Sequence, residues 1–143
     1  MRVTWGIGEA AAFYEGEGYF GAKRNPYGHP TALRLTVAQR NEQPLQWFLN
    51  AVEVGRVQHR LIRGKDFWNY VAGKTANSLY VAKLIWPYLS DRRQDQIFDA
   101  IDEFLSVRHI LQYDVSFFTE EVRAEAELQL ITPAQVRKLH TRA

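Results

Sequence analysis

The hydrophobic residues of this chain follow two spacings, and each spacing predicts one kind of element. Apolar and polar residues alternate most clearly over 31–40 and 56–61, which is typical of half-buried strands. The predicted strands cover residues 19–24, 31–40, 56–61 and 66–72. Apolar residues three or four positions apart predict helices between Thr4 and Gly16, over 42–52, and over 75–105 with an interruption at Pro87. This order predicts an α+β fold, a single αββαββα unit with helices on one face of a four-stranded antiparallel sheet.

Composition narrows the class of protein. The chain has 143 residues, of which 46% are hydrophobic and 24% charged, so disorder is excluded as its main state. It has no cysteine, which excludes disulfides and thiolate metal sites. No apolar segment approaches the ~20 residues that span a bilayer, and the first residues lack a signal-peptide pattern. We therefore expect an intracellular protein with no membrane partner.

The polar face of the predicted sheet is basic. No acidic residue occurs over 19–41 or over 56–64, although a solvated sheet face normally mixes both signs. Arginine and glutamine on adjacent strands present paired donors and acceptors to base edges in the major groove of DNA. A solvated face without a partner is the alternative interpretation. The candidate DNA-binding residues are Lys23, Arg24, Arg34, Thr36, Arg56, Gln58 and Arg60.

The first predicted helix has one face almost without side-chain bulk. Its members are Gly8, Ala11, Ala12 and Glu15, spaced i, i+3, i+4 and i+7. Small side chains let two helix backbones come closer than the usual ~8–10 Å, so this face predicts an interface with another helix. A separate face with Ile7, Ala10 and Tyr14 is apolar and is expected to pack on the chain's own core.

Two carboxylates flank Gly16 where this helix is expected to end. Glu15 and Glu17 lie near the negative end of the helix dipole, so a positive charge is expected to offset them. Mg²⁺ is held in proteins by one or two carboxylates together with water and substrate phosphate. The alternative is that both are solvated surface acids.

Residues 10–20, AAAFYEGEGYF, resemble the signature of the LAGLIDADG homing endonucleases in its variant form ending Asp-Gly-Glu-Gly-aromatic-Phe. The resemblance places the metal-binding acid of that motif on Glu17, with Gly16 beside it in the metal site. Two further segments match in order, over 35–40 (LTVAQR) and over 86–94 (WPYLSDRRQ). Together the matches span roughly residues 5–105 of the chain, within a predicted core domain of 1–108.

The resemblance implies an active site of three side chains. Gln39 stands at the end of the second strand, where the family has a glutamine near the scissile phosphates. The active-site lysine of the family falls on Arg92, with Arg93 as the alternate position. Arginine keeps the charge but titrates less readily than lysine, which favours electrostatic stabilisation over proton transfer.

The function implied is site-specific cleavage of double-stranded DNA with Mg²⁺ or Mn²⁺. Because the chain carries one motif and duplex cleavage needs two sites, the resemblance implies a homodimer on a long, near-palindromic target. A nuclease-dead DNA-binding regulator or an intron-RNA maturase of the same fold is the second hypothesis. A plain oligomerisation module is the third. The chain has no phosphate-cradling glycine loop or nucleophile elbow, and we expect no small-molecule cofactor.

Residues 109–143 lie beyond the resemblance and are expected to form a helical extension. Thr119, followed by two glutamates, and Thr132 are typical of helix starts. A capping appendage on the core is the favoured interpretation. A basic tail that touches DNA outside the central site is the alternative.

Overall fold

The computed structural model of the chain describes residues 4–28 and 30–107, and the elements run in the predicted order. The predicted extension over 109–143 lies outside the described residues. The helices and strands are α1 (Ile7–Glu17), β1 (Gly18–Arg24), β2 (Pro30–Gln39), α2 (Glu42–Val52), β3 (Arg56–Ile62), β4 (Lys65–Val71), α3 (Thr75–Ile85), the 3₁₀ turn η1 (Trp86–Tyr88) and α4 (Asp91–Val107). The α+β prediction is therefore confirmed, including the break between α3 and α4 at Pro87.

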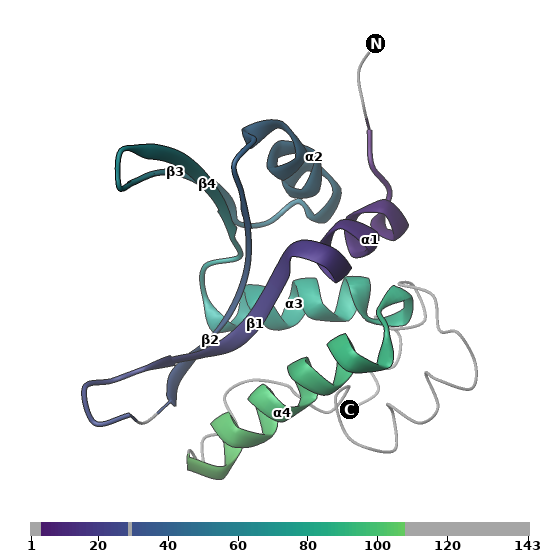
Figure 1. Cartoon of the computed structure of the whole chain (residues 1–143). Coiled ribbons are helices and arrows are strands. Elements are labelled where there is room, and N and C mark those ends of the chain that lie inside the picture. The colour runs from purple at the N-terminus through teal and green to yellow at the C-terminus, as the bar shows by residue number, and fades with distance from the viewer. Residues whose placement is uncertain (1–3, 29, 108–143) are drawn as a thin grey trace.

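The four strands form one antiparallel sheet in the order β1-β2-β4-β3. Val37 of β2 lies opposite Gly18 on one side and Tyr70 on the other, so β2 is central. The β1–β2 hairpin and the β3–β4 hairpin curve toward the same side (Figure 1). The face of the sheet away from the helices is therefore concave.

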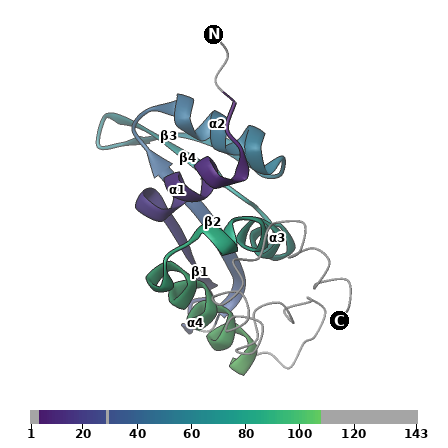
Figure 2. The same cartoon turned by 90° about the vertical axis from the view of Figure 1, so that its right-hand side faces the viewer.

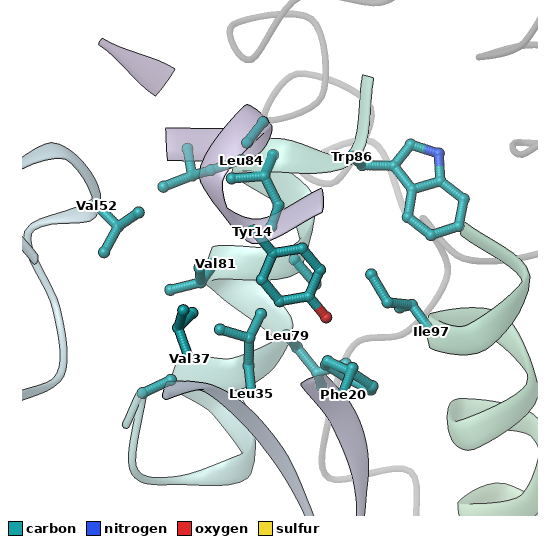
Figure 3. Packing of buried hydrophobic residues seen from close by; sticks show 14 of the residues in the cluster. Tyr14, Phe20, Leu35, Val37, Val52, Leu79, Val81, Leu84, Trp86 and Ile97 are labelled. Atoms are coloured by element: carbon teal, nitrogen blue, oxygen red, sulfur yellow. The ribbon is translucent and has the colours of Figure 1, made fainter. Parts of the chain in front are cut away.

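The helices cover the other face of the sheet, as Figure 2 shows. The alternation predicted for β2 holds, because Leu33, Leu35 and Val37 are buried beneath the helices while Arg34 is exposed. Figure 3 shows Tyr14 of α1 at the centre of this core, between the strands and α3. Further fully buried members of the core are Phe20, Phe48, Tyr70, Ile85, Trp86 and Ile97.

Hydroxyl groups of α3 extend the hydrogen bonding of β2 beyond its pairing with β4. That pairing begins only at Thr36. The amides of Leu33 and Leu35 donate instead to Thr75 Oγ1 and Ser78 Oγ, each at 3.1 Å. Both hydroxyls are buried, so they satisfy backbone amides that water does not reach. They also fix α3 against the central strand.

Both ends of α1 differ from the sequence prediction. Its N-cap is Gly6 rather than Thr4, and the Gly6 amide donates to the carboxylate of Glu9 at 2.8 Å. The helix ends at Glu17, with Gly18 following it, rather than at Gly16. A Cβ at position 18 would collide with the buried ring of Tyr14, whereas nothing lies within 4 Å of a Cβ at Gly16. Close packing on Tyr14, which is not visible in the sequence, makes Gly18 the glycine that this turn requires.

Candidate nucleic-acid interface and cleavage site

A groove of about 660 Å³ runs over the concave outer face of the sheet. Its residues come from β1, β2, β3 and β4 and from the start of α3. They are Tyr19, Arg34, Leu35, Thr36, Arg56, Gln58, Arg60, Asn69, Val71, Gly73 and Lys74. Five of the seven candidate DNA-binding residues therefore share one surface, because alternate positions on neighbouring strands point to the same side. We call this surface the outer groove.

The outer groove is positively charged. Arg34, Arg56, Arg60 and Lys74 line it, and no acidic side chain does. With its amide oriented to satisfy both groups, Gln58 accepts hydrogen bonds from Nε and Nη2 of Arg56 at 2.8 and 2.9 Å. This pair leaves the Gln58 amide nitrogen and the other N–H donors of Arg56 to face a ligand. A groove of one sign focuses its potential and attracts the opposite charge.

Tyr19 lies flat across β1 at one edge of the outer groove. A Cβ at Gly21 would collide with its ring, so the glycine provides the space that this orientation needs. The sequence analysis did not select Tyr19, nor did it select Asn69 and Lys74. Asn69 was detectable, because it alternates with the buried Tyr70 in β4, but nothing local marks Lys74 as a groove residue.

The remaining two candidate DNA-binding residues, Lys23 and Arg24, lie on opposite faces of the sheet. Lys23 is exposed and follows Tyr19 and Gly21 on the outer face of β1. Arg24 turns to the helix side, where it forms an ion pair with Glu103 of α4 and donates to the carbonyl of Gly28 at 3.0 Å. The expectation that Arg24 faces the groove is wrong. Because Lys23 points to the outer face, alternation along β1 places Arg24 on the opposite face, which α4 covers.

The C-terminal end of α1 joins the N-terminal end of α4 through polar contacts. Both carboxylate oxygens of Glu15 accept from Ser90, one from its amide and one from its hydroxyl, each at 2.7 Å. In return, Nε and Nη1 of Arg93 donate to the carbonyls of Glu15 and Gly18 at 2.9 and 2.8 Å. We call Glu15, Ser90 and Arg93 the helix-junction clasp.

Arg93 therefore does not serve as the alternate site cation. It is only 8% exposed, and its guanidinium lies over the ring of Tyr14, 5.6 Å from the ring centre. The neighbouring Arg92 has a side chain that is 72% exposed. Its Nη2 lies 3.8 Å from Glu15 Oε2. Arg92 is thus the arginine whose charge faces solvent at this junction.

Glu17 is the last residue of α1 and is exposed. In the described part of the chain its carboxylate has no hydrogen bond or ion pair. Gly18 lies opposite Val37, so the same register brings Gln39 level with the end of α1. The Gln39 side-chain oxygen accepts from the Arg40 amide at 3.1 Å. Glu17 and Arg92 thus lie in the two segments that meet where α1 ends, and Gln39 lies at the end of the neighbouring strand β2.

Of the two carboxylates at the end of α1, that of Glu17 is the one open to a ligand. Among residues 4–28 and 30–107, no three His, Cys, Asp or Glu side chains gather into a metal cluster. Glu15 has both oxygens occupied by Ser90, whereas Glu17 and Gly16 are exposed. One free carboxylate with an open side fits Mg²⁺, which keeps most of its water and takes further oxygens from phosphate.

The small face of α1 is narrower than predicted. Ala11 is fully buried in the chain's own core and offers no surface to a second helix, and the Glu15 carboxylate is held by Ser90. Gly8 and Ala12 are exposed, and Gly16 continues the same line at i+8. The correction follows from helix geometry, because Ala11 lies one turn from the buried Tyr14.

Comparison with known proteins finds a fold but no close relative. No family model and no curated protein matches the chain. The homing endonuclease I-CvuI, solved with its DNA target and calcium, matches with a TM-score of 0.51 and 20% identity over 95% of this chain and 92% of that one. The homing endonuclease I-TnaI (TM-score 0.39, 13% identity) matches over 90% of this chain and 100% of its own. The archaeal intron-encoded homing endonuclease I-Vdi141I, complexed with DNA (TM-score 0.40, 12% identity), matches over 85% of this chain and 96% of its own.

The match to I-CvuI shows that this chain has the homing-endonuclease fold. The LAGLIDADG resemblance seen in three sequence segments is therefore confirmed at the level of the fold. Among the described residues, no helix is both long and apolar enough to cross a membrane.

Proposed function

We propose that this protein is a site-specific endonuclease that cleaves both strands of a DNA duplex as a homodimer, using a divalent metal. The observation that carries the proposal is the outer groove, which holds four cationic side chains and no acid on a curved sheet. The fold agrees, since the solved I-CvuI complex contains its DNA target.

The outer groove supplies both components of DNA recognition. Arg34, Arg60 and Lys74 neutralise phosphates, which gives affinity and releases counterions. Arg56, Gln58 and Asn69 carry the paired donors and acceptors that distinguish base edges in the major groove. A sheet in the major groove can make both kinds of contact at once.

Glu17 and the Gly16 carbonyl are the groups proposed to hold Mg²⁺ or Mn²⁺. The bound metal would act as a Lewis acid on the phosphate and lower the pKa of water. Glu17 supplies its carboxylate without first breaking an intramolecular bond. Gln39 orients the attacking water through its side-chain amide. Arg92 stabilises the negative charge that develops on the phosphate.

Two copies of the chain are proposed to pair through α1. Gly8, Ala12 and Gly16 leave one line of this helix nearly flat, which permits close approach of a second α1. A twofold axis between the two helices brings two Glu17 carboxylates together, one for each DNA strand. Such symmetry predicts a near-palindromic target.

The test is cleavage of a randomised duplex library by wild type and Glu17→Gln, with DNA binding followed in parallel. Wild type is expected to cut both strands with Mg²⁺ or Mn²⁺, and Glu17→Gln to bind the same sequences without cutting. Glu53→Gln serves as a matched control, because it removes an exposed acid at the end of α2, and should cut normally.

Three results would overturn this proposal in different ways. Binding of duplex DNA without cleavage by wild type would indicate a DNA-binding regulator of the same fold, and preference for RNA would indicate a maturase. No binding to either nucleic acid would leave the sheet as a solvated face of an oligomerisation module.

A further inference from the structure

The helix-junction clasp reaches between two segments that lie 75 residues apart in the sequence. Glu15 extends from α1 to Ser90, and Arg93 extends back from α4 to the carbonyls of Glu15 and Gly18. The Ser90 hydroxyl also accepts from the Arg93 amide at 3.3 Å, which closes the first turn of α4. Each helix therefore provides a side chain that satisfies the backbone of the other.

These contacts between α1 and α4 are electrostatically favourable at both helix ends. The C-terminal end of α1 carries partial negative charge, and Arg93 brings a guanidinium to its carbonyls. The N-terminal end of α4 carries partial positive charge, and Glu15 brings a carboxylate to it. Arg93 makes a third bond, to Gln96 Oε1 at 2.9 Å, which holds its own side chain in place. The two helix ends are thus fixed to each other in orientation as well as in distance.

Both proposed site residues lie inside the segments that the clasp fixes. Glu17 stands between Glu15 and Gly18, whose carbonyls both accept from Arg93. Arg92 stands between Ser90 and Arg93 in the first turn of α4, and its guanidinium lies near the Glu15 carboxylate. A shift of either segment would move one proposed catalytic group relative to the other.

We propose that Glu15 and Arg93 are positioning residues that hold Glu17 and Arg92 in the relation that phosphodiester cleavage requires. This inference rests on the proposed function for its reaction, but the clasp also makes predictions that need no cleavage. It assigns Glu15 neither to the metal nor to the dimer interface, because both of its oxygens already accept from Ser90.

The first experiment separates positioning from metal binding. Binding of Mn²⁺ is measured by electron paramagnetic resonance in wild type, Glu15→Gln and Glu17→Gln. Wild type and Glu15→Gln are expected to bind Mn²⁺ within about twofold of each other, because the ligand carboxylate is Glu17. Loss of Mn²⁺ in Glu15→Gln comparable to that in Glu17→Gln would overturn the assignment of Glu15.

The second experiment measures the cleavage rate at saturating DNA and metal. Since misplacement by about 1 Å can cost on the order of 100-fold in rate, Glu15→Gln and Arg93→Lys are expected to lower kcat at least tenfold with KM nearly unchanged. In the double variant Glu15→Gln/Arg92→Gln the losses should not add, because Glu15 acts through Arg92. Asn41→Ala is the matched control, since Asn41 caps α2 by accepting from the Gln43 amide. It should keep the wild-type kcat.

Equal loss of kcat in Glu15→Gln and Asn41→Ala would mean that the clasp contributes only to general stability, and it would overturn the proposal.

If wild type does not cleave DNA at all, the proposed function fails by that result alone. Hydrogen exchange of the Ser90 amide then tests the clasp itself. Glu15→Ala should accelerate that exchange while leaving the Ala72 amide, which donates to Leu35, protected as in wild type. Unchanged exchange at Ser90 would overturn the clasp.

Discussion

The helix junction and the outer groove both carry arginine, yet they use it in opposite ways. At the junction, Arg93 is buried and its donors reach two carbonyls and one amide oxygen within the chain. In the groove, Arg34 and Arg60 line an open surface on which no carboxylate lies. One region has its polar groups satisfied internally, and the other leaves them for a partner.

This contrast explains which residues fix geometry and which ones bind. A buried cation is tolerated when hydrogen bonds offset its desolvation, and the three bonds of Arg93 also restrict its movement. Exposed arginines lose little by staying hydrated until a polyanion displaces their counterions. Substitutions at the junction should therefore change stability, whereas substitutions in the groove should change affinity.

The largest expected effect comes from Arg93→Met. It leaves the carbonyls of Glu15 and Gly18 without their donor at a buried site, so the free energy of unfolding should fall by about 3 kcal/mol. Arg92→Met, one residue away and exposed, should change it by less than about 0.5 kcal/mol. Urea unfolding of both variants measures the difference. Equal effects would contradict the distinction between the two arginines.

Substitutions in the outer groove should change the affinity for DNA. Arg60→Gln is expected to weaken DNA binding by about 1–2 kcal/mol and to reduce the slope of log K against log salt by about 1, because one phosphate contact is lost. Its unfolding free energy should stay within about 0.5 kcal/mol of wild type. Arg24→Gln is the control, since Arg24 faces α4, and its salt slope should match that of wild type. Fluorescence anisotropy over a salt series provides the slopes.

Substitutions in the exposed line of small residues on α1 should change the affinity between two copies of the chain. Ala12→Arg places a long charged side chain where close helix approach is proposed, and it should raise the dimer dissociation constant at least tenfold, or about 1.4 kcal/mol. Sedimentation velocity measures this shift, and thermal unfolding of the monomer should be unaffected. A wild-type monomer at working concentration would argue against the dimer itself.

Alkaline pH should weaken the core rather than the groove. Burial raises the pKa of Tyr14 and that of Tyr70 well above the ordinary value of 10.0. A group whose pKa is raised on folding stabilises the protein fully below its unfolded pKa, and this contribution is lost as pH rises above it. Stability should therefore decline above about pH 10. In Tyr70→Phe the decline should be shallower, although loss of the bond to Val54 costs about 1 kcal/mol at neutral pH.

Local patterns predicted the fold well and the site only in part. Alternation in β2 and β3 identified five side chains that do share the outer groove. Lys23 and Arg24 are adjacent in β1, so alternation lets only one of them face the groove, and a prediction that included both misplaced Arg24. Ala11 was misplaced because small size favours both a helix interface and a crowded core, and spacing alone does not distinguish them. The choice between Arg92 and Arg93 was also beyond local reasoning.

The sequence by itself determined the order of elements, the face of each strand that is buried, and the absence of acid from the polar face. These features follow from the spacing of residues within a few positions, because the geometry of a strand or a helix fixes which face each residue points to. Only the tertiary structure decided that Glu15 caps a helix beginning 75 residues later, that Gly18 must accommodate Tyr14, and that the two hairpins curve into a groove. Such contacts depend on how α1, α4 and the sheet pack together, and that packing is a property of the whole core rather than of any one segment.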